Sequence, residues 1–209
     1  MKRSIGLVAL ALAMTSCNGI FSGLYDEVES ALPFGFIQVN EADDSGTIYI
    51  DARDYEKWIY ISLKDKSVDT ANMVKEEPEP SRWDFALHRY DVKTNQGTAR
   101  ETEFLTMDAL KAHGHYDEGL FVADTAGRVV VDMSTMMEGY LGYHASNVNK
   151  VLSRWLNVDT STMPPIYTMS GKVYLLRLAD GTFAALLFTD FMDESSVKGY
   201  ITIKYIYPL

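Results

Sequence analysis

Cysteine is almost absent from this chain, which has only one, Cys17, in 209 residues. A disulfide within the chain is therefore excluded, and the fold must be stabilised by packing. Basic residues are also scarce: 19 Lys and Arg stand against 29 Asp and Glu, leaving a net charge of −10. They are scattered rather than clustered, which disfavours binding to nucleic acid.

The motifs of common enzyme sites are missing as well. The chain has no glycine-rich phosphate loop and no Gly-x-Ser-x-Gly nucleophile motif. Acidic residues are abundant, but no spacing among them singles out an acid and base pair. We therefore expect a protein that is not an enzyme.

Histidine, the commonest metal ligand, occurs only four times. His113 and His115 form a weak metal motif, and an exposed loop is the ordinary interpretation of that spacing. His88 lies in a strand pattern and is expected to be a hydrogen-bonded structural residue. His144 lies between two methionine clusters and is the one histidine kept as an alternative ligand.

Residues 1–17 have the features of a bacterial signal peptide. Two basic residues precede an apolar run of roughly ten residues, which is too short to span a bilayer as a helix. Met14-Thr-Ser-Cys17 resembles a lipobox, although Met14 replaces the commoner leucine. We expect lipidation at Cys17, residues 18–33 as a tether and residues 34–209 as one folded domain.

From Phe34 onward the pattern is typical of β-strands. Segments rich in Ile, Val, Tyr, Phe and Trp alternate with turn residues, which predicts an antiparallel all-β fold. The expected strands are Phe34–Asn40, Thr47–Asp51, Lys57–Leu63, Arg82–Lys93, Arg128–Asp132, Lys172–Leu178, Thr182–Phe191 and Lys198–Tyr207. Asp180-Gly181 predicts a hairpin turn, because these residues accept positive φ.

Helix is expected only in short pieces. Thr106–Ala112 predicts one, with Thr106 as its N-cap. Apolar residues recur at helical spacing over Ser146–Leu156, which predicts a second. That helix would bring Lys150 and Arg154 onto one face.

Five of the ten methionines form two clusters on either side of this second segment. They are Met133, Met136, Met137, Met163 and Met169. The first cluster follows an apolar strand and leads into Gly139, and such strand ends commonly present sites. In the second, Met163 precedes Pro164 and Pro165, which stiffen the backbone around it. Thioethers in these places suit haem iron or copper, although methionine is more often a flexible core residue.

Several separate segments resemble the HmuY family in the same order along the chain. They are Arg82–Asn95, Tyr140–Leu156, Met163–Tyr167, Lys172–Thr182 and Lys198–Tyr205. The likeness spans residues 35–209. These segments identify the chain as similar to haem-binding lipoproteins of the Bacteroidetes that act as hemophores.

The resemblance implies a fold of two antiparallel sheets with haem b held between loops at one end. It also implies delivery of the haem to a TonB-dependent outer-membrane receptor, with host haemoproteins as a potential source. The expected location is the outer membrane at the cell surface, with a released or vesicle-borne form as a variant.

The resemblance also guides the choice of ligands. The founding member of the family uses two histidines and other members use methionines, and the corresponding loops here offer methionine. We select Met136 and Met163 as axial ligands, with Met137 and Met169 as the alternative pair. The expected walls of the pocket are Tyr140, Tyr143, Ile166 and Tyr167, and Lys150 or Arg154 would meet a propionate.

Two alternatives from other classes remain open, and one of them, an enzyme on a β scaffold, would need a convergent acid and base pair that the sequence does not show. A glycan-binding or adhesive surface lipoprotein without a haem site would present exposed aromatic residues on a sheet. Trp58 and Tyr60 are the candidates for such residues.

Overall fold

The computed structural model describes residues 33–40 and 42–209. The predicted signal peptide, the lipidation site at Cys17 and nearly all of the predicted tether lie outside the described residues. Within the described part of the chain, no helix is long and apolar enough to cross a membrane.

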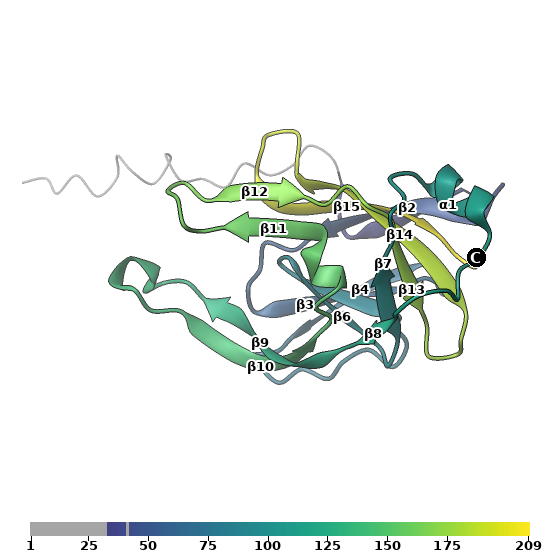
Figure 1. Cartoon of the computed structure of the whole chain (residues 1–209). Coiled ribbons are helices and arrows are strands. Elements are labelled where there is room, and N and C mark those ends of the chain that lie inside the picture. The colour runs from purple at the N-terminus through teal and green to yellow at the C-terminus, as the bar shows by residue number, and fades with distance from the viewer. Residues whose placement is uncertain (1–32, 41) are drawn as a thin grey trace, which may run out of the picture.

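Two antiparallel sheets form the body of the molecule (Figure 1). The larger has seven strands, in the order β1 (Phe36–Asn40), β2 (Ser45–Asp51), β15 (Lys198–Ile206), β14 (Phe183–Met192), β13 (Tyr174–Arg177), β7 (Thr98–Glu101) and β8 (Val122–Ala123). The smaller has four, in the order β4 (Ser67–Asn72), β3 (Lys57–Ser62), β5 (Phe85–His88) and β6 (Asp91–Thr94). The prediction of an all-β fold is confirmed.

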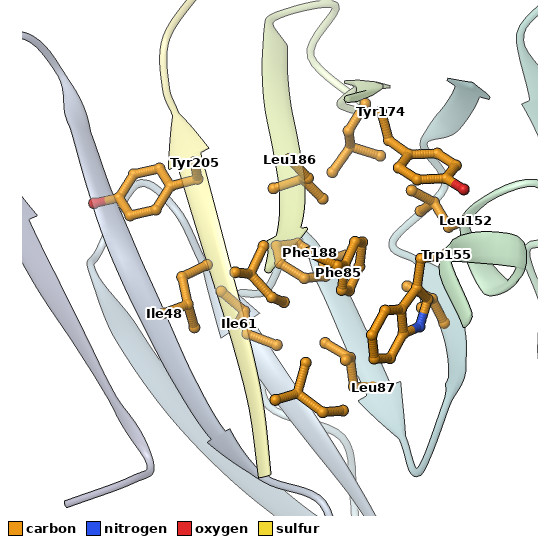
Figure 2. Close-up of a cluster of buried hydrophobic side chains, with 14 of the residues drawn as sticks. Ile48, Ile61, Phe85, Leu87, Leu152, Trp155, Tyr174, Leu186, Phe188 and Tyr205 are labelled. Atoms are coloured by element: carbon orange, nitrogen blue, oxygen red, sulfur yellow. The ribbon is translucent and has the colours of Figure 1, made fainter. Parts of the chain in front are cut away.

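The main core lies between these two sheets. Ile48 and Leu186 of the larger sheet belong to one buried cluster with Ile61 and Leu87 of the smaller, and Trp155 packs beside them (Figure 2). Burial of large aliphatic and aromatic side chains contributes roughly 1.5–3 kcal/mol each. The sheets are therefore held together by apolar packing, as a chain without a disulfide requires.

The outer faces of both sheets are covered as well. Trp58 and Tyr60 alternate with the core residues of β3 and form a second cluster on the far side, together with Val129. A third cluster lies on the larger sheet, where Leu110 of the helix α1 (Met107–His113) is buried. Because the smaller sheet is covered on both faces, every residue of β5 is buried.

Two further strand pairs, which we call the first and second arms, project from one end of the body (Figure 1). The first arm is β9 (Thr125–Asp132) with β10 (Gly142–Val148), and the second is β11 (Leu156–Asp159) with β12 (Ile166–Met169). Each arm forms a two-stranded sheet of its own. A seven-residue segment, 149–155, connects them and includes the short 3-10 helix η2 (Leu152–Trp155).

Several local predictions are confirmed. Thr106 caps α1, with its side chain accepting from the Ala109 amide at 3.2 Å. Asp180-Gly181 forms the turn between β13 and β14, and Gly181 has a φ of +87°. The last predicted strand forms as β15, and its Ile201, Ile203 and Tyr205 are buried.

Two predictions of longer elements are wrong. The expected helix Ser146–Leu156 is instead the end of β10, a turn and η2, because residues 146–148 pair with Gly127, Ala126 and Thr125 across the first arm. The helical spacing of its apolar residues therefore describes only one short turn. The expected strand Arg82–Lys93 is a hairpin, since Arg89 adopts a positive φ and separates β5 from β6.

Candidate functional site

The tip of the first arm is an ordered turn that carries two of the predicted site residues. Met136 opens the 3-10 helix η1 (Met136–Glu138), which ends at Gly139 with a φ of +85°. The Gly139 amide donates to the Met136 carbonyl at 3.0 Å, and the Tyr140 amide donates to the Thr135 carbonyl at 3.2 Å. These bonds order the turn, and its two methionines, Met136 and Met137, are exposed.

The two methionines of this turn differ in exposure. The side chain of Met136 is 45 % exposed, whereas that of Met137 is 89 % exposed. The Met136 side chain is therefore partly covered by the protein, whereas Met137 extends into solvent. A thioether that is partly packed has fewer conformations to lose on binding a ligand.

The tip of the second arm carries Met163, which is 84 % exposed. The peptide between Met163 and Pro164 is cis. Within the turn, the Thr162 hydroxyl donates to the Pro164 carbonyl at 3.1 Å, and the Ser161 amide donates to the Asp159 carboxylate at 2.9 Å. Met163 thus lies on a turn with its own hydrogen bonds, as the two prolines indicated.

The remaining predicted residues of the second arm separate into two faces. Ile166 is 53 % exposed, whereas Tyr167 and Met169 pack against the main core. The ring of Tyr167 stacks on Phe191, with centroids 5.5 Å apart. Met169 therefore lies at the base of its arm, away from the tip where Met163 lies.

The first arm adds two exposed tyrosines to the same end of the molecule. Tyr140 is 70 % exposed and Tyr143 is 46 % exposed. Of the eleven large hydrophobic side chains that are exposed among the described residues, six lie on the two arms: Met136, Met137, Tyr140, Tyr143, Met163 and Ile166. Exposed apolar surface gathered in one place indicates a binding site.

A cationic residue is also associated with an aromatic ring on each arm, and no sequence pattern indicates either contact. The guanidinium of Arg128 lies 4.2 Å from the centre of the Tyr143 ring, and the ammonium of Lys198 lies 5.0 Å from that of Tyr167. Arg128 pairs with Ala145 and Tyr143 pairs with Val130, so the two residues lie on adjacent strands two pairs apart, a relationship visible only once the register is known. Both cations can pair with carboxylates such as the propionates of haem.

The proposed propionate partners occupy other positions. Arg154 lies in η2 and its guanidinium is 3.6 Å from the Glu101 carboxylate. Lys150 is exposed in the segment that connects the arms. The helix that was expected to align these two residues does not form, so Lys150 and Arg154 do not share a helix face.

The histidines lie away from the two tips. His88 is buried and its Nε2 lies 2.7 Å from the Tyr55 carbonyl, so its predicted structural role is confirmed. His113 ends α1 and its ring meets that of His115 edge to face. His144 is half-buried on β10, opposite Val129. No group of three or more His, Cys, Asp or Glu in the described part of the chain is arranged to hold a metal.

The aromatic residues suggested for glycan binding are buried. Trp58 and Tyr60 are 2 % and 3 % exposed, so the expectation of exposed aromatic residues there is wrong. They line a cleft of about 840 Å³, but the Lys93 ammonium already lies 4.7 and 4.8 Å from the two ring centres. It also donates to Glu79. The ring faces are thus occupied by the protein itself.

Comparison with known proteins assigns the chain to a family. The family model described as HmuY protein matches residues 54–205, well over half of the sequence. The chain belongs to the HmuY family. HmuY-like proteins bind haem and are not enzymes, which confirms the expectation that this chain is not an enzyme. A search of curated proteins gave no significant match.

Solved structures of HmuY-like proteins share the fold. A putative HmuY-like haem-binding protein from Bacteroides vulgatus is 48 % identical, with a TM-score of 0.80 over 85 % of this chain and 99 % of that one. A putative lipoprotein from Bacteroides fragilis is 49 % identical, with a TM-score of 0.81 over 87 % and 99 %. The apo HmuY analog of Tannerella forsythia is 22 % identical, with a TM-score of 0.66 over 79 % and 97 %, and shares the fold.

Proposed function

We propose that this chain captures haem b between its two arms, with the sulfurs of Met136 and Met163 as the axial ligands of the iron. The observation that carries the proposal is the gathering of exposed apolar side chains and thioethers on two hairpins that project from the same end (Figure 1). The 48 % identity to a structure described as a HmuY-like haem-binding protein supports it.

The choice between the two candidate pairs rests on where the sulfurs lie. Met136 and Met163 are both exposed and each lies at the tip of an arm. In the alternative pair, Met169 packs against the core at the base of the second arm. A ligand sulfur must leave its packing partners to reach an iron, which makes Met169 the less favourable choice.

Most of the affinity is expected from apolar contact. Burial of a few hundred Å² of porphyrin is worth on the order of 10 kcal/mol before the cost of association. Tyr140, Tyr143 and Ile166 are exposed without ligand and can provide this contact. Tyr167, stacked on Phe191, would form the floor of the site rather than a mobile wall.

The axial sulfurs then determine the preferred oxidation state. A thioether is a soft ligand and favours ferrous over ferric iron. Haem should therefore bind more tightly after reduction with dithionite, with a sharper Soret band. Equal affinity in both oxidation states would count against two methionine ligands.

The cellular role follows from a lipid anchor at Cys17. Lipidation there would hold the protein at the outer membrane, exposed at the cell surface. Arms that carry the haem at one end of the molecule leave it accessible to a TonB-dependent outer-membrane receptor. Host haemoproteins are the proposed source of the haem, and a released or vesicle-borne form would extend its reach.

The test is a set of haemin difference spectra, oxidised and reduced, for the wild type and three alanine variants. Met136→Ala and Met163→Ala should each lose the spectral features of one methionine ligand. Each should also lower haem affinity by roughly 10- to 100-fold. Met137→Ala is the matched control, because it removes the adjacent and more exposed methionine. Wild-type spectra when Met136 or Met163 is replaced would refute the proposed pair, and an unchanged haemin spectrum in the wild type would refute haem binding.

A further inference from the structure

The placement of the two arm tips depends on the short segment that joins the arms. The first arm ends at Val148 and the second begins at Leu156, so only residues 149–155 lie between them. Neither arm is paired with a strand of either sheet of the body. Side-chain contacts and the connecting segment must therefore fix how the arms lie relative to each other.

Asn149 is the first residue of this segment and is completely buried. Its Nδ2 donates to the Val122 carbonyl and to Asp124 Oδ1, both at 2.9 Å. Its Oδ1 accepts from the amides of Val151 at 3.1 Å and Leu152 at 3.0 Å. All four hydrogen-bonding positions of the carboxamide are thus used: the nitrogen donates two bonds and the oxygen accepts two.

These partners belong to different parts of the site. Asp124 immediately precedes β9, so its bond to Asn149 joins the beginning and the end of the first arm. Val151 and Leu152 lead into η2 and the second arm. One buried carboxamide therefore connects the base of the first arm with the start of the second.

The same group is attached to the body through β6. Asp124 accepts from the Thr94 amide at 2.7 Å and from the Thr94 hydroxyl at 2.9 Å. The backbone amide of Asn149 donates to the Val92 carbonyl at 2.7 Å. Both ends of the first arm are thereby hydrogen-bonded to one strand of the smaller sheet.

The far end of the connecting segment is fixed to β6 and its turn as well. The Ser153 hydroxyl accepts from the Val92 amide at 2.9 Å. The Trp155 indole donates to the Tyr90 carbonyl at 3.0 Å, and its ring stacks on Phe188 with centroids 4.4 Å apart. The segment is therefore held at both ends, and Asn149 is the point at which it meets the first arm.

We propose that Asn149 is a positioning residue of the haem site, which sets the separation of the two arms and so allows both sulfurs to reach one iron. This inference rests on the proposed function. A second ligand binds efficiently only when its effective concentration at the iron is high, and preorganised arms supply that without the cost of ordering them. Asn149 is completely buried, so it would act through the arms and not by contact with the haem.

Loss of the carboxamide has a specific consequence. Asn149→Ala removes four hydrogen bonds and leaves Asp124, Val122 and two amides without this partner. The arms should then sample a range of separations. One sulfur would still bind, but the second would bind only in part of the molecules, and haem affinity should fall by roughly 10- to 100-fold.

The first measurement needs no haem. Spin labels at Glu138→Cys and Ser161→Cys, one on each arm tip, report the distance between the arms in full-length protein carrying Cys17→Ser. We expect a narrow distance distribution in this background and a broad one when Asn149→Ala is added. Asn147→Ala is the matched control, because Asn147 is exposed two residues earlier and its side chain has no hydrogen bond in the described part of the chain.

A second variant guards against loss of folding. Asn149→Asp keeps the acceptor for Val151 and Leu152 but removes both donated bonds and faces the Asp124 carboxylate with a like charge. It should broaden the distance distribution while the far-ultraviolet circular dichroism spectrum remains that of the wild type. A purely structural role would lower the melting temperature and leave the distances below it unchanged, which would overturn the inference.

Haem spectra then separate this inference from the function on which it rests. If wild type binds haem through two sulfurs, Asn149→Asp should show a mixture of one- and two-sulfur species, and Asn147→Ala should match wild type. Spectra of Asn149→Asp identical to wild type would refute the positioning role alone. Failure of the wild type to bind haem would refute the proposed function, whatever the labels report.

Discussion

Asp124 immediately precedes the first arm in the sequence and Asn149 immediately follows it, and the two side chains are joined by a hydrogen bond of 2.9 Å. The bond closes the base of a hairpin whose tip, at Met136, lies at the far end of β9 and β10. It has no counterpart in the sequence pattern, because the two residues are 25 positions apart. We therefore expect the separation of the two hairpin tips to depend on contacts at their bases.

The acid stability of the haem complex should reflect the chemistry of its ligands. A thioether carries no proton near neutrality, whereas a free imidazole titrates near pH ~6.5. We expect haem retention to be unchanged between pH 7.5 and pH 5.5, measured by Soret absorbance after gel filtration. Loss of haem with a midpoint near the imidazole pKa would instead indicate a histidine ligand.

Asp91 should make the fold less stable at neutral pH than at acid pH. Burial raises the pKa of this carboxyl from 3.8 to about 6. A raised folded-state pKa stabilises the fold below the unfolded value, and that contribution is lost as pH rises through about 6. Asp91→Asn should therefore increase the free energy of unfolding at pH 7.5 by roughly 1–3 kcal/mol. Urea denaturation at pH 7.5 and pH 4 measures this, and an equal gain at both values would contradict it.

Replacing Met169 should not change the haem spectrum, although Met169 belongs to the alternative ligand pair. It packs against the main core and pairs with Leu156 across the second arm. Met169→Leu conserves volume, so the expected loss of stability is below about 1.5 kcal/mol. Oxidised and reduced spectra of the haem complex should match wild type, and loss of an axial band would show that Met169 binds iron.

The sequence predicted local features of the fold best. Asp180-Gly181 and the Thr106 cap are determined by neighbouring residues, and both formed as expected. The prediction of a helix around Val148 was wrong, because the strand conformation of this segment depends on pairing with Thr125, which lies 23 positions away. The hairpin at Arg89 was not predicted for another reason. Both faces of the smaller sheet are buried, so no change in the alternation of apolar and polar residues marks the turn.

The candidate site was predictable to a similar extent. A glycine after Met136 and prolines after Met163 are local signals, and the structure places both residues at arm tips. The packing of Met169 and the position of Arg128 over Tyr143 depend on the register of the strands, which the sequence did not reveal. The network around Asn149 depends on contacts with Asp124 and Val122 before the first arm, so it was missed entirely.

We propose that sulfur atoms from two separate hairpins bind one iron from opposite sides. X-ray absorption at the iron edge of the reduced haem complex counts those sulfur atoms directly. We predict two sulfur ligands in the wild type and in Met137→Ala, and one in each of Met136→Ala and Met163→Ala. A wild-type spectrum without sulfur ligands, or variants that keep both, would contradict coordination by Met136 and Met163.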